Sequence, residues 1–210
     1  MSTIKLTDDE VVAASLLLSA IWPIGIRTVD VTDAEGVGRA AFRGERSLLA
    51  RDLATVTEGR VQLDDSVAAA FGAVASAARH TVVAIGRRTQ PVAAAAPFVS
   101  FHSTADVDRW IIVASSPIGV ADIEKVDRAG AVATLTQLQA RCFEEGVPGG
   151  SPGDDLALFV GRFGLGQNDV LEFALGSVRL ASVREPAMPT APASWSEVPW
   201  EPDLAVAGLA

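Results

Sequence analysis

The sequence is poor in the residues that most often build disulfides and metal sites. Its 210 residues contain one cysteine, Cys142, and two histidines, His80 and His102. A single cysteine excludes an intrachain disulfide and agrees with a reducing cytoplasm. Zinc takes four ligands, mostly Cys and His at close spacing, so we expect no metal ion and no cofactor. Cys142 falls on the apolar face of a predicted helix, where an unreactive buried thiol is expected.

Motifs of known enzyme classes are also missing. There is no G-x-S-x-G nucleophile elbow and no Walker lysine, and the glycines of 36–38 and 161–166 do not have the dinucleotide-binding spacing and context. Three acidic pairs each precede an apolar helical run, where carboxylates are typical of helix starts. They are Asp8-Asp9, Asp64-Asp65 and Asp154-Asp155. We therefore predict no catalytic residue and a protein that is not an enzyme.

The charge and the apolar runs argue against two further classes. A net charge of −9 opposes nucleic-acid binding, which draws its affinity from lysine and arginine contacts to phosphate. The longest apolar run, 11–26, contains Ser15, Ser19 and Pro23 and falls short of the ~20 residues of a membrane span. Three acidic residues precede it, unlike the basic start of a signal peptide. We expect a cytoplasmic protein with no membrane insertion.

Capping signals and apolar periodicity predict four helices in residues 1–145. The first starts at Thr7, where Glu10 completes a capping box, and runs to about residue 20 as a largely buried helix. A strand at 26–31 precedes a second helix at 42–56, with Leu48, Leu49, Leu53 and Val56 inward. Residues 57–60 form a turn. A third helix opens at Asp64-Asp65, and a fourth covers 128–143 with Val132, Leu135, Leu138 and Cys142 on one face.

Between the third and fourth helices the pattern changes to strands. We predict strands at 81–86, 98–103, 109–115 and 118–126, separated by Pro91, Pro97 and Pro117. Their connections are too short for crossover helices, so the strands should pair antiparallel as a meander. The predicted fold class is α+β, with a central antiparallel β-sheet covered by α-helices.

The domain organisation follows from these elements. Residues 1–145 form an α+β core domain, and 146–153 are a glycine- and proline-rich linker. Residues 154–184 complete the fold with a short helix, whose Leu156, Phe159, Val160 and Phe163 recur at helical spacing, and with strands at 170–175 and 177–183. Residues 185–210 contain five prolines, and we predict a flexible tail without regular structure.

Large apolar residues after the linker are the candidate partner-binding site. Phe163, Leu165, Trp195 and Trp200 lie in a region whose short elements can bury few of them. Tryptophan is enriched in binding hot spots, and apolar patches on soluble proteins mark interaction sites. The alternative is that these side chains fold back onto the protein's own core.

Three segments together resemble the EspG family, the cytosolic chaperones of type VII (ESX) secretion. They are RGERSLLARDLA at 43–54, EGRVQLD at 58–64, and a helix through Phe71 and Val74 that leads into TVVAI at 81–85. The resemblance covers about residues 5–145 and lies in the order of elements. It implies a non-enzymatic factor that shields an apolar surface of a protein client, such as a PE/PPE- or WXG-type secretion substrate. Family members are usually longer, with a second helical half after the sheet.

Two other functions stay open from the residues. One is a small ligand-binding domain or enzyme that uses the sheet as a pocket floor, with His102 and Asp106 or Asp108 at its mouth. The other is a structural homo-oligomer subunit with no client.

Overall fold

The computed structural model describes residues 3–77, 79–87, 98–103, 109–144, 156–164, 172–175, 180–184 and 196–199. The chain forms two compact units. The first comprises Met1–Ala77 and Ile111–Lys125, and the second comprises Ala78–Trp110 and Val126–Ala210. Within the part of the chain that is described, no helix has both the length and the apolar character that a membrane span requires.

The first unit starts with a strand that leads directly into a capped helix. β1 (Ile4–Thr7) pairs antiparallel with β7 (Val120–Asp127), placing Leu6 opposite Ala121. Thr7 then caps α1 (Asp8–Leu18): its Oγ accepts a hydrogen bond from the Glu10 N–H, and the Glu10 carboxylate accepts one from the Thr7 N–H. This reciprocal pair is the capping box that the sequence predicts.

The prediction for residues 26–56 is wrong in two respects. No strand forms at 26–31, and the second helix lies further toward the N-terminus, as α2 (Ala34–Ala50). Asp33 caps α2 by accepting a hydrogen bond from the Glu35 N–H, so the helix begins before the apolar positions on which the prediction depended. It ends because Arg51 and Asp52 leave helical geometry, Asp52 with a φ of 56°.

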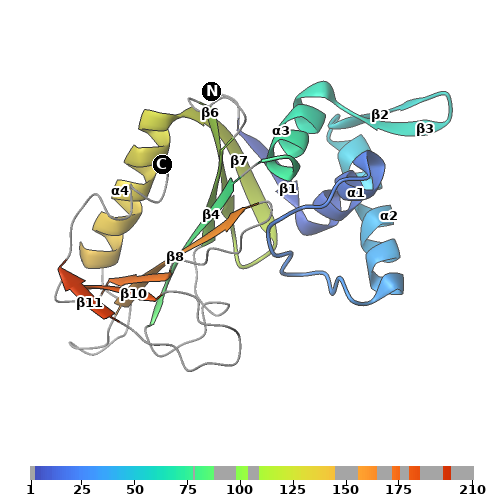
Figure 1. Ribbon diagram of the computed structural model, residues 1–210. Helices are drawn as coiled ribbons and strands as arrows, with labels where there is room; N and C mark the ends of the chain where they lie inside the picture. Colours follow the sequence, from blue (N-terminus) through green and yellow to red (C-terminus); the bar gives the residue numbers. More distant parts are fainter. Residues whose placement is uncertain are drawn as a thin grey trace. The chain divides into compact units, whose positions relative to one another are not determined.

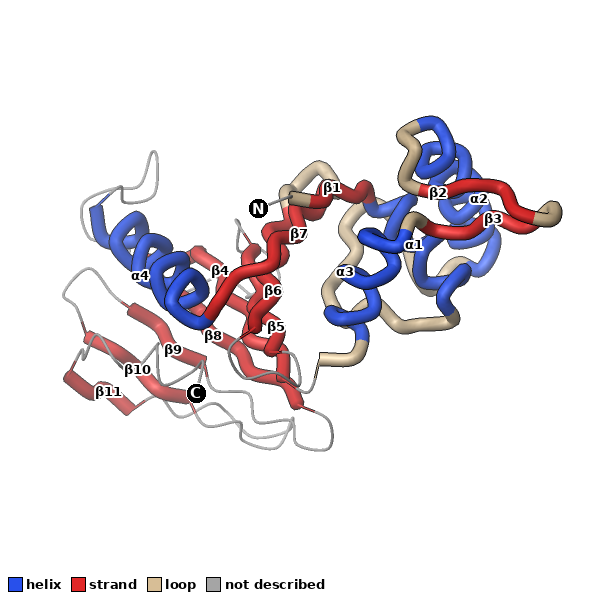
Figure 2. The backbone as a smooth tube through the Cα atoms, turned by 90° about the horizontal axis from the view of Figure 1, so that it is seen from above, coloured by secondary structure: helices blue, strands red, loops and turns tan. Residues whose placement is uncertain are grey.

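The residues after α2 form a hairpin, β2 (Ala54–Thr57) and β3 (Arg60–Leu63). Glu58 and Gly59 both have positive φ, 52° and 76°, which is the geometry of a two-residue hairpin turn. The turn predicted at 57–60 is confirmed. Val56 was predicted to point inward from a helix but lies on the hairpin and is 60% exposed. Figures 1 and 2 show the hairpin extending from the three helices.

The third helix and the strands complete the core of the first unit. Asp64 caps α3 (Asp65–Ala75) through the Ser66 N–H, as predicted. The core is one continuous cluster of buried side chains from β1, the three helices, β6 (Arg109–Ser115) and β7. Its largest members are Leu6, Leu48, Phe71, Ile111 and Ile123. Trp22 stacks on Phe71 with ring centroids 4.8 Å apart.

Close packing of α1 against α2 depends on one glycine. A Cβ added at Gly44 would overlap the backbone oxygen of Asp9 and would lie 2.9 Å from the Cβ of Ala13. Glycine is therefore required here by the approach of the two helices. A second small cluster on the same pair of helices contains Val12, Ala40 and Ala41.

The predicted strands form an antiparallel sheet, which confirms the α+β fold class. Hydrogen-bonded strands follow the order β1-β7-β6-β5-β4-β8, with β4 at Arg79–Arg87 and β5 at Phe98–Ser103. Consecutive strands β4 to β7 are neighbours, as a meander requires. The predicted helix after them is α4 (Arg128–Glu144), which buries Ala131, Leu135 and Leu138.

The helix predicted to start at Asp154-Asp155 is wrong, because Leu156–Gly164 is strand β8. β8 pairs antiparallel with β4 along its whole length, from Leu156 opposite Arg87 to Gly164 opposite Arg79. Its apolar residues fit helical spacing, but they also form a continuous run rich in β-formers. A short apolar run does not distinguish helix from strand, and pairing with β4 decides the outcome.

Regular structure also occurs where the sequence predicts none. β9 (Glu172–Leu175) and β10 (Leu180–Arg184) confirm the two predicted strands, and β11 (Ser196–Pro199) lies within the predicted irregular tail. These three strands form a sheet in the order β11-β10-β9. β11 is compatible with its proline because Pro199 is the last residue of an outer strand, where no ladder donor is needed.

Candidate functional site

The residues predicted to bind a partner belong to the segment that begins with β8. Phe163 lies on β8 opposite His80 of β4. Leu165, Trp195 and Trp200 lie outside the described residues. In sequence, Leu165 directly follows β8, and the two tryptophans immediately precede and follow β11. The partner-binding role of these four residues stays a prediction.

The two histidines form a pair between β4 and β5, in which His102 is buried and His80 is half-buried. His80 and His102 lie directly opposite each other in the antiparallel register, and their Nδ1 atoms are 2.7 Å apart. Nε2 of His102 is 2.9 Å from Ser100 Oγ. Because two acceptors or two donors cannot share this bond, one Nδ1 donates and the other accepts. The Ser100 hydroxyl can either donate to or accept from Nε2 of His102, so this nitrogen has a partner in both tautomers of the ring.

Burial of this pair changes how it titrates. His102 is 0% exposed. Burial, and then repulsion from His80, lower the pKa of His102 from 6.5 to about 3. Burial also lowers the pKa of His80. Both imidazoles are therefore neutral at pH 7. The hypothesis that placed His102 at the mouth of a pocket is wrong, because the ring is enclosed by the sheet; Asp106 and Asp108 lie outside the described residues.

Two of the three acidic pairs lie at helix starts, as the sequence predicts, and Asp8 has an additional role. Asp9 and Glu10 lie in the first turn of α1, and Asp64 caps α3. Asp8, which is 8% exposed, accepts hydrogen bonds from the Arg27 N–H, the Thr28 N–H and the Thr28 hydroxyl, all at 2.7–2.9 Å. It thereby holds the loop after α1. The third pair, Asp154-Asp155, lies outside the described residues and precedes a strand.

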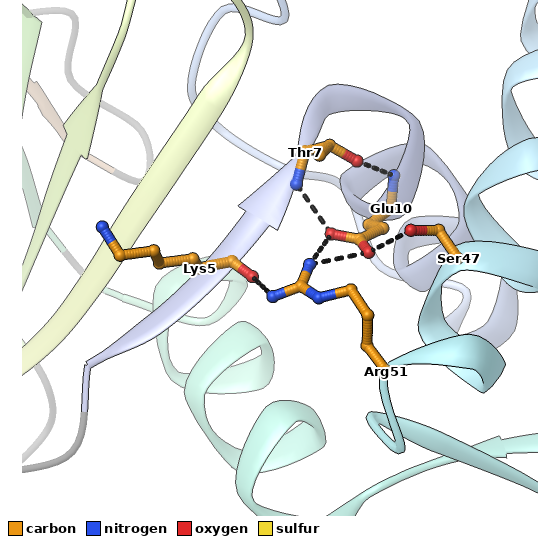
Figure 3. Close-up of polar contacts among 5 residues, drawn as sticks. All are labelled: Lys5, Thr7, Glu10, Ser47 and Arg51. Carbon is orange, nitrogen blue, oxygen red and sulfur yellow. Dashed lines mark hydrogen bonds and ion pairs between the residues drawn. The ribbon is translucent and has the colours of Figure 1, made fainter.

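Glu10 is the centre of the most extensive polar network in the described part of the chain (Figure 3). Its side chain is 0% exposed. Besides the Thr7 N–H, its carboxylate accepts hydrogen bonds from the Ser47 hydroxyl at 2.7 Å and from Arg51 Nη1 at 2.7 and 2.8 Å. Nη2 of Arg51 donates to the backbone oxygen of Lys5 at 2.9 Å. The network joins β1, α1 and α2, so the arrangement is structural. Among the described residues, no cluster of three metal-ligating side chains occurs.

Sequence reasoning missed a group of exposed apolar residues in the first unit. α1 was predicted to be largely buried, but Leu16 is 58% exposed, and Ile21 beyond its end is 86% exposed. On α2, Phe42 is 61% exposed and lines an open groove together with Glu35, Gly38, Arg39 and Arg43. Only the true bounds of α2 show that these residues share a face, because the predicted helix started at residue 42.

In the part of the chain that is described, these elements define an α+β protein whose antiparallel sheet is combined with three helices before strand β4 and one after strand β7. No family model and no curated protein matches the sequence. Among solved structures, the chain is similar to the Mycobacterium tuberculosis type VII secretion system chaperone EspG5, whose structure was determined in complex with the PE25–PPE41 dimer. The TM-score is 0.53 at 13% identity, and the match covers 99% of this chain and 94% of EspG5. At this identity, the likeness shows a shared fold.

Proposed function

We propose that this protein is a non-enzymatic, chaperone-like factor that binds a protein client and shields its apolar surface. The observation that carries the proposal is the fold shared with EspG5 over nearly the whole of both chains. The match covers 99% of this chain and 94% of that chain, so it is not confined to one part of either protein. The three segments that resemble the EspG family by sequence agree with this fold.

The client that this proposal favours is a heterodimer of the PE–PPE kind, since EspG5 was solved with such a dimer. For the binding surface we propose the loops of the sheet together with the segment that starts at β8. Phe163, Leu165, Trp195 and Trp200 are its candidate contact residues. Phe163 lies near the end of β8, an outer strand of the six-stranded sheet. In the sequence, Leu165 follows β8 and the two tryptophans flank β11.

A direct test is coexpression of the protein with PE–PPE pairs encoded in the same genome. We expect one pair to co-elute with it in size-exclusion chromatography at a fixed stoichiometry, and titration calorimetry to show saturable binding. Absence of binding to every such pair, with all proteins folded, would contradict the proposed function.

The contact residues are tested separately with a double variant, Trp195→Ala with Trp200→Ala. Because tryptophan is a frequent hot-spot residue, we expect the affinity for the pair to fall at least about tenfold, which corresponds to about 1.4 kcal/mol. The thermal transition should change little if the rings face a partner. A large fall in the transition temperature would show instead that the tryptophans belong to the protein's own core.

A further inference from the structure

Helix α2 has a buried face and an exposed face, and the exposed face carries one large apolar residue, Phe42. The inner face buries Ala40, Gly44 and Leu48. The other carries Gly38, Phe42 and Arg46, which are exposed and follow one another at four-residue intervals. Residues spaced by four along a helix lie one above another. These three positions therefore form a single row, which we call the outer row of α2.

Phe42 is the apolar centre of the outer row. Its 61% exposure leaves most of a large aromatic surface in water, where burial would contribute roughly 25 cal/mol per Å². The groove beside it has a volume of about 550 Å³ and is open to solvent.

Gly38 supplies a second, independent observation. Glycine inside an exposed helix costs about 1 kcal/mol relative to alanine. At Gly44 the cost has a structural reason, because a Cβ would overlap α1. At Gly38 a Cβ would meet nothing within 4 Å, and the backbone has no positive φ. The fold of this chain therefore does not require glycine at position 38. The missing side chain leaves room for close approach of another backbone at this point.

The charges around the outer row point to the chemistry of the occupant. Three arginines lie on or beside it. Arg39 pairs with Glu35 and Asp33, and Arg43 forms two hydrogen bonds with the Asp9 carboxylate at 2.7 and 2.8 Å. Arg46 differs from both: its guanidinium lies over the Phe42 ring, 5.8 Å from the centroid, and no carboxylate pairs with it in the described part of the chain. This leaves one cation next to the apolar surface with capacity for an anionic partner group.

We propose that the outer row of α2 is a docking surface for an α-helix of the client protein. The helix would pack across Gly38, place an apolar side chain in the groove against Phe42, and present a carboxylate one turn further along to Arg46. A helix fits because the row repeats every four residues, which is the spacing of the ridges that interlock when two helices pack. A small residue such as Gly38 permits their close approach. This inference rests on the proposed function and adds a second contact surface to it.

The experiment uses the purified PE–PPE heterodimer that binds the wild-type protein. We expect Phe42→Ala, Arg46→Glu and Gly38→Leu each to weaken its binding at least about tenfold, with unchanged circular dichroism. Gly38→Ala separates stability from binding, because it should raise the thermal transition temperature and still lower the affinity. Matched controls are Val56→Ala and Arg60→Glu on the exposed hairpin, which should bind like wild type.

A charge swap identifies the partner group. An acidic residue of the client that faces Arg46, when changed to lysine, should weaken binding to the wild-type chain and restore binding to Arg46→Glu. If the wild-type chain binds the heterodimer and all outer-row variants bind it equally well, the docking surface is wrong and the proposed function survives. If the wild-type chain binds no heterodimer, the proposed function fails first. If Phe42→Ala instead dissolves a homodimer of this chain, the occupant is a second copy and the proposal is overturned.

Discussion

The histidine pair predicts a specific dependence of stability on pH. The pKa of His102 is about 3 in the folded protein and about 6.5 in an unfolded chain. Below pH 6.5 the unfolded state binds a proton that the folded state does not, so acid favours unfolding. The contribution of the neutral His102 is therefore fully present above pH 6.5. It decreases as pH falls from 6.5 toward 3.

The size of this effect follows from the same values. At pH 4.5, two units below the unfolded pKa, the loss from His102 is about 3 kcal/mol, since each pKa unit corresponds to 1.36 kcal/mol. At pH 3, where His102 of the folded protein is itself half protonated, the loss reaches about 4 kcal/mol, which is close to the total stability of a marginally stable domain. His80 acts in the same direction because burial also lowers its pKa.

The assay is urea unfolding of the wild-type protein and of His102→Asn between pH 8 and pH 4.5. At pH 8 the variant should be less stable, because it loses the bond between the two imidazoles. As pH falls, the difference between the two proteins should shrink by about 3 kcal/mol, since the variant has no His102 to protonate. Comparing the two proteins removes the effect of carboxylates that titrate in the same range.

Two results would refute this reasoning. One is that the free energies of unfolding of the wild-type protein and of His102→Asn change in parallel with pH. This would show that His102 has the same pKa in the folded and unfolded states. The other is a titration of His102 in the folded protein near pH 6.5, measured by imidazole NMR signals. His80→Asn is a useful control, because removal of the neighbouring imidazole should raise the pKa of His102 while burial still holds it below 6.5.

Three further predictions concern the first unit. Gly44→Ala should lower the free energy of unfolding by about 1–3 kcal/mol through overpacking, whereas Gly38→Ala should not lower it. If urea unfolding showed Gly38→Ala to be the less stable of the two variants, the contacts assigned between α1 and α2 would be wrong. Arg51→Ala leaves the Glu10 carboxylate buried without its cation and should lower the free energy of unfolding by about 3 kcal/mol. Arg60→Ala on the hairpin should lower it less. Equal urea midpoints for the two variants would show that Glu10 does not need Arg51. Val11→Asp should prevent soluble folding, and Leu16→Asp should be tolerated; a folded Val11→Asp protein would place α1 outside the core.

Local chemistry is sufficient to determine several elements of the fold. Thr7 and Glu10 form a capping box that depends only on residues three positions apart, and Asp64 caps α3 in the same local way. The meander was predictable because prolines and short connections leave antiparallel pairing as the simple solution. The resemblance to EspG chaperones likewise depended on the order of these elements.

Errors arose where a short pattern fits two structures. The segment 156–163 has apolar residues at helical spacing, namely Leu156, Phe159, Val160 and Phe163. It forms a strand because β4 provides a hydrogen-bonding partner along its full length. The bounds of α2 were misplaced because the apolar signal starts after Asp33, the residue that caps the helix. That shift hid the outer row of α2 from sequence reasoning.

Tertiary structure alone decided the contacts between residues far apart in the chain. Glu10 meets Arg51, and His80 meets His102, through packing and strand register that no local pattern encodes. Burial also excluded the alternative that placed His102 at a pocket mouth, because the imidazole is enclosed and neutral. The physical reason is that capping and turn formation depend on neighbours in sequence, whereas burial, ion pairing and pKa depend on which surfaces the whole fold brings together.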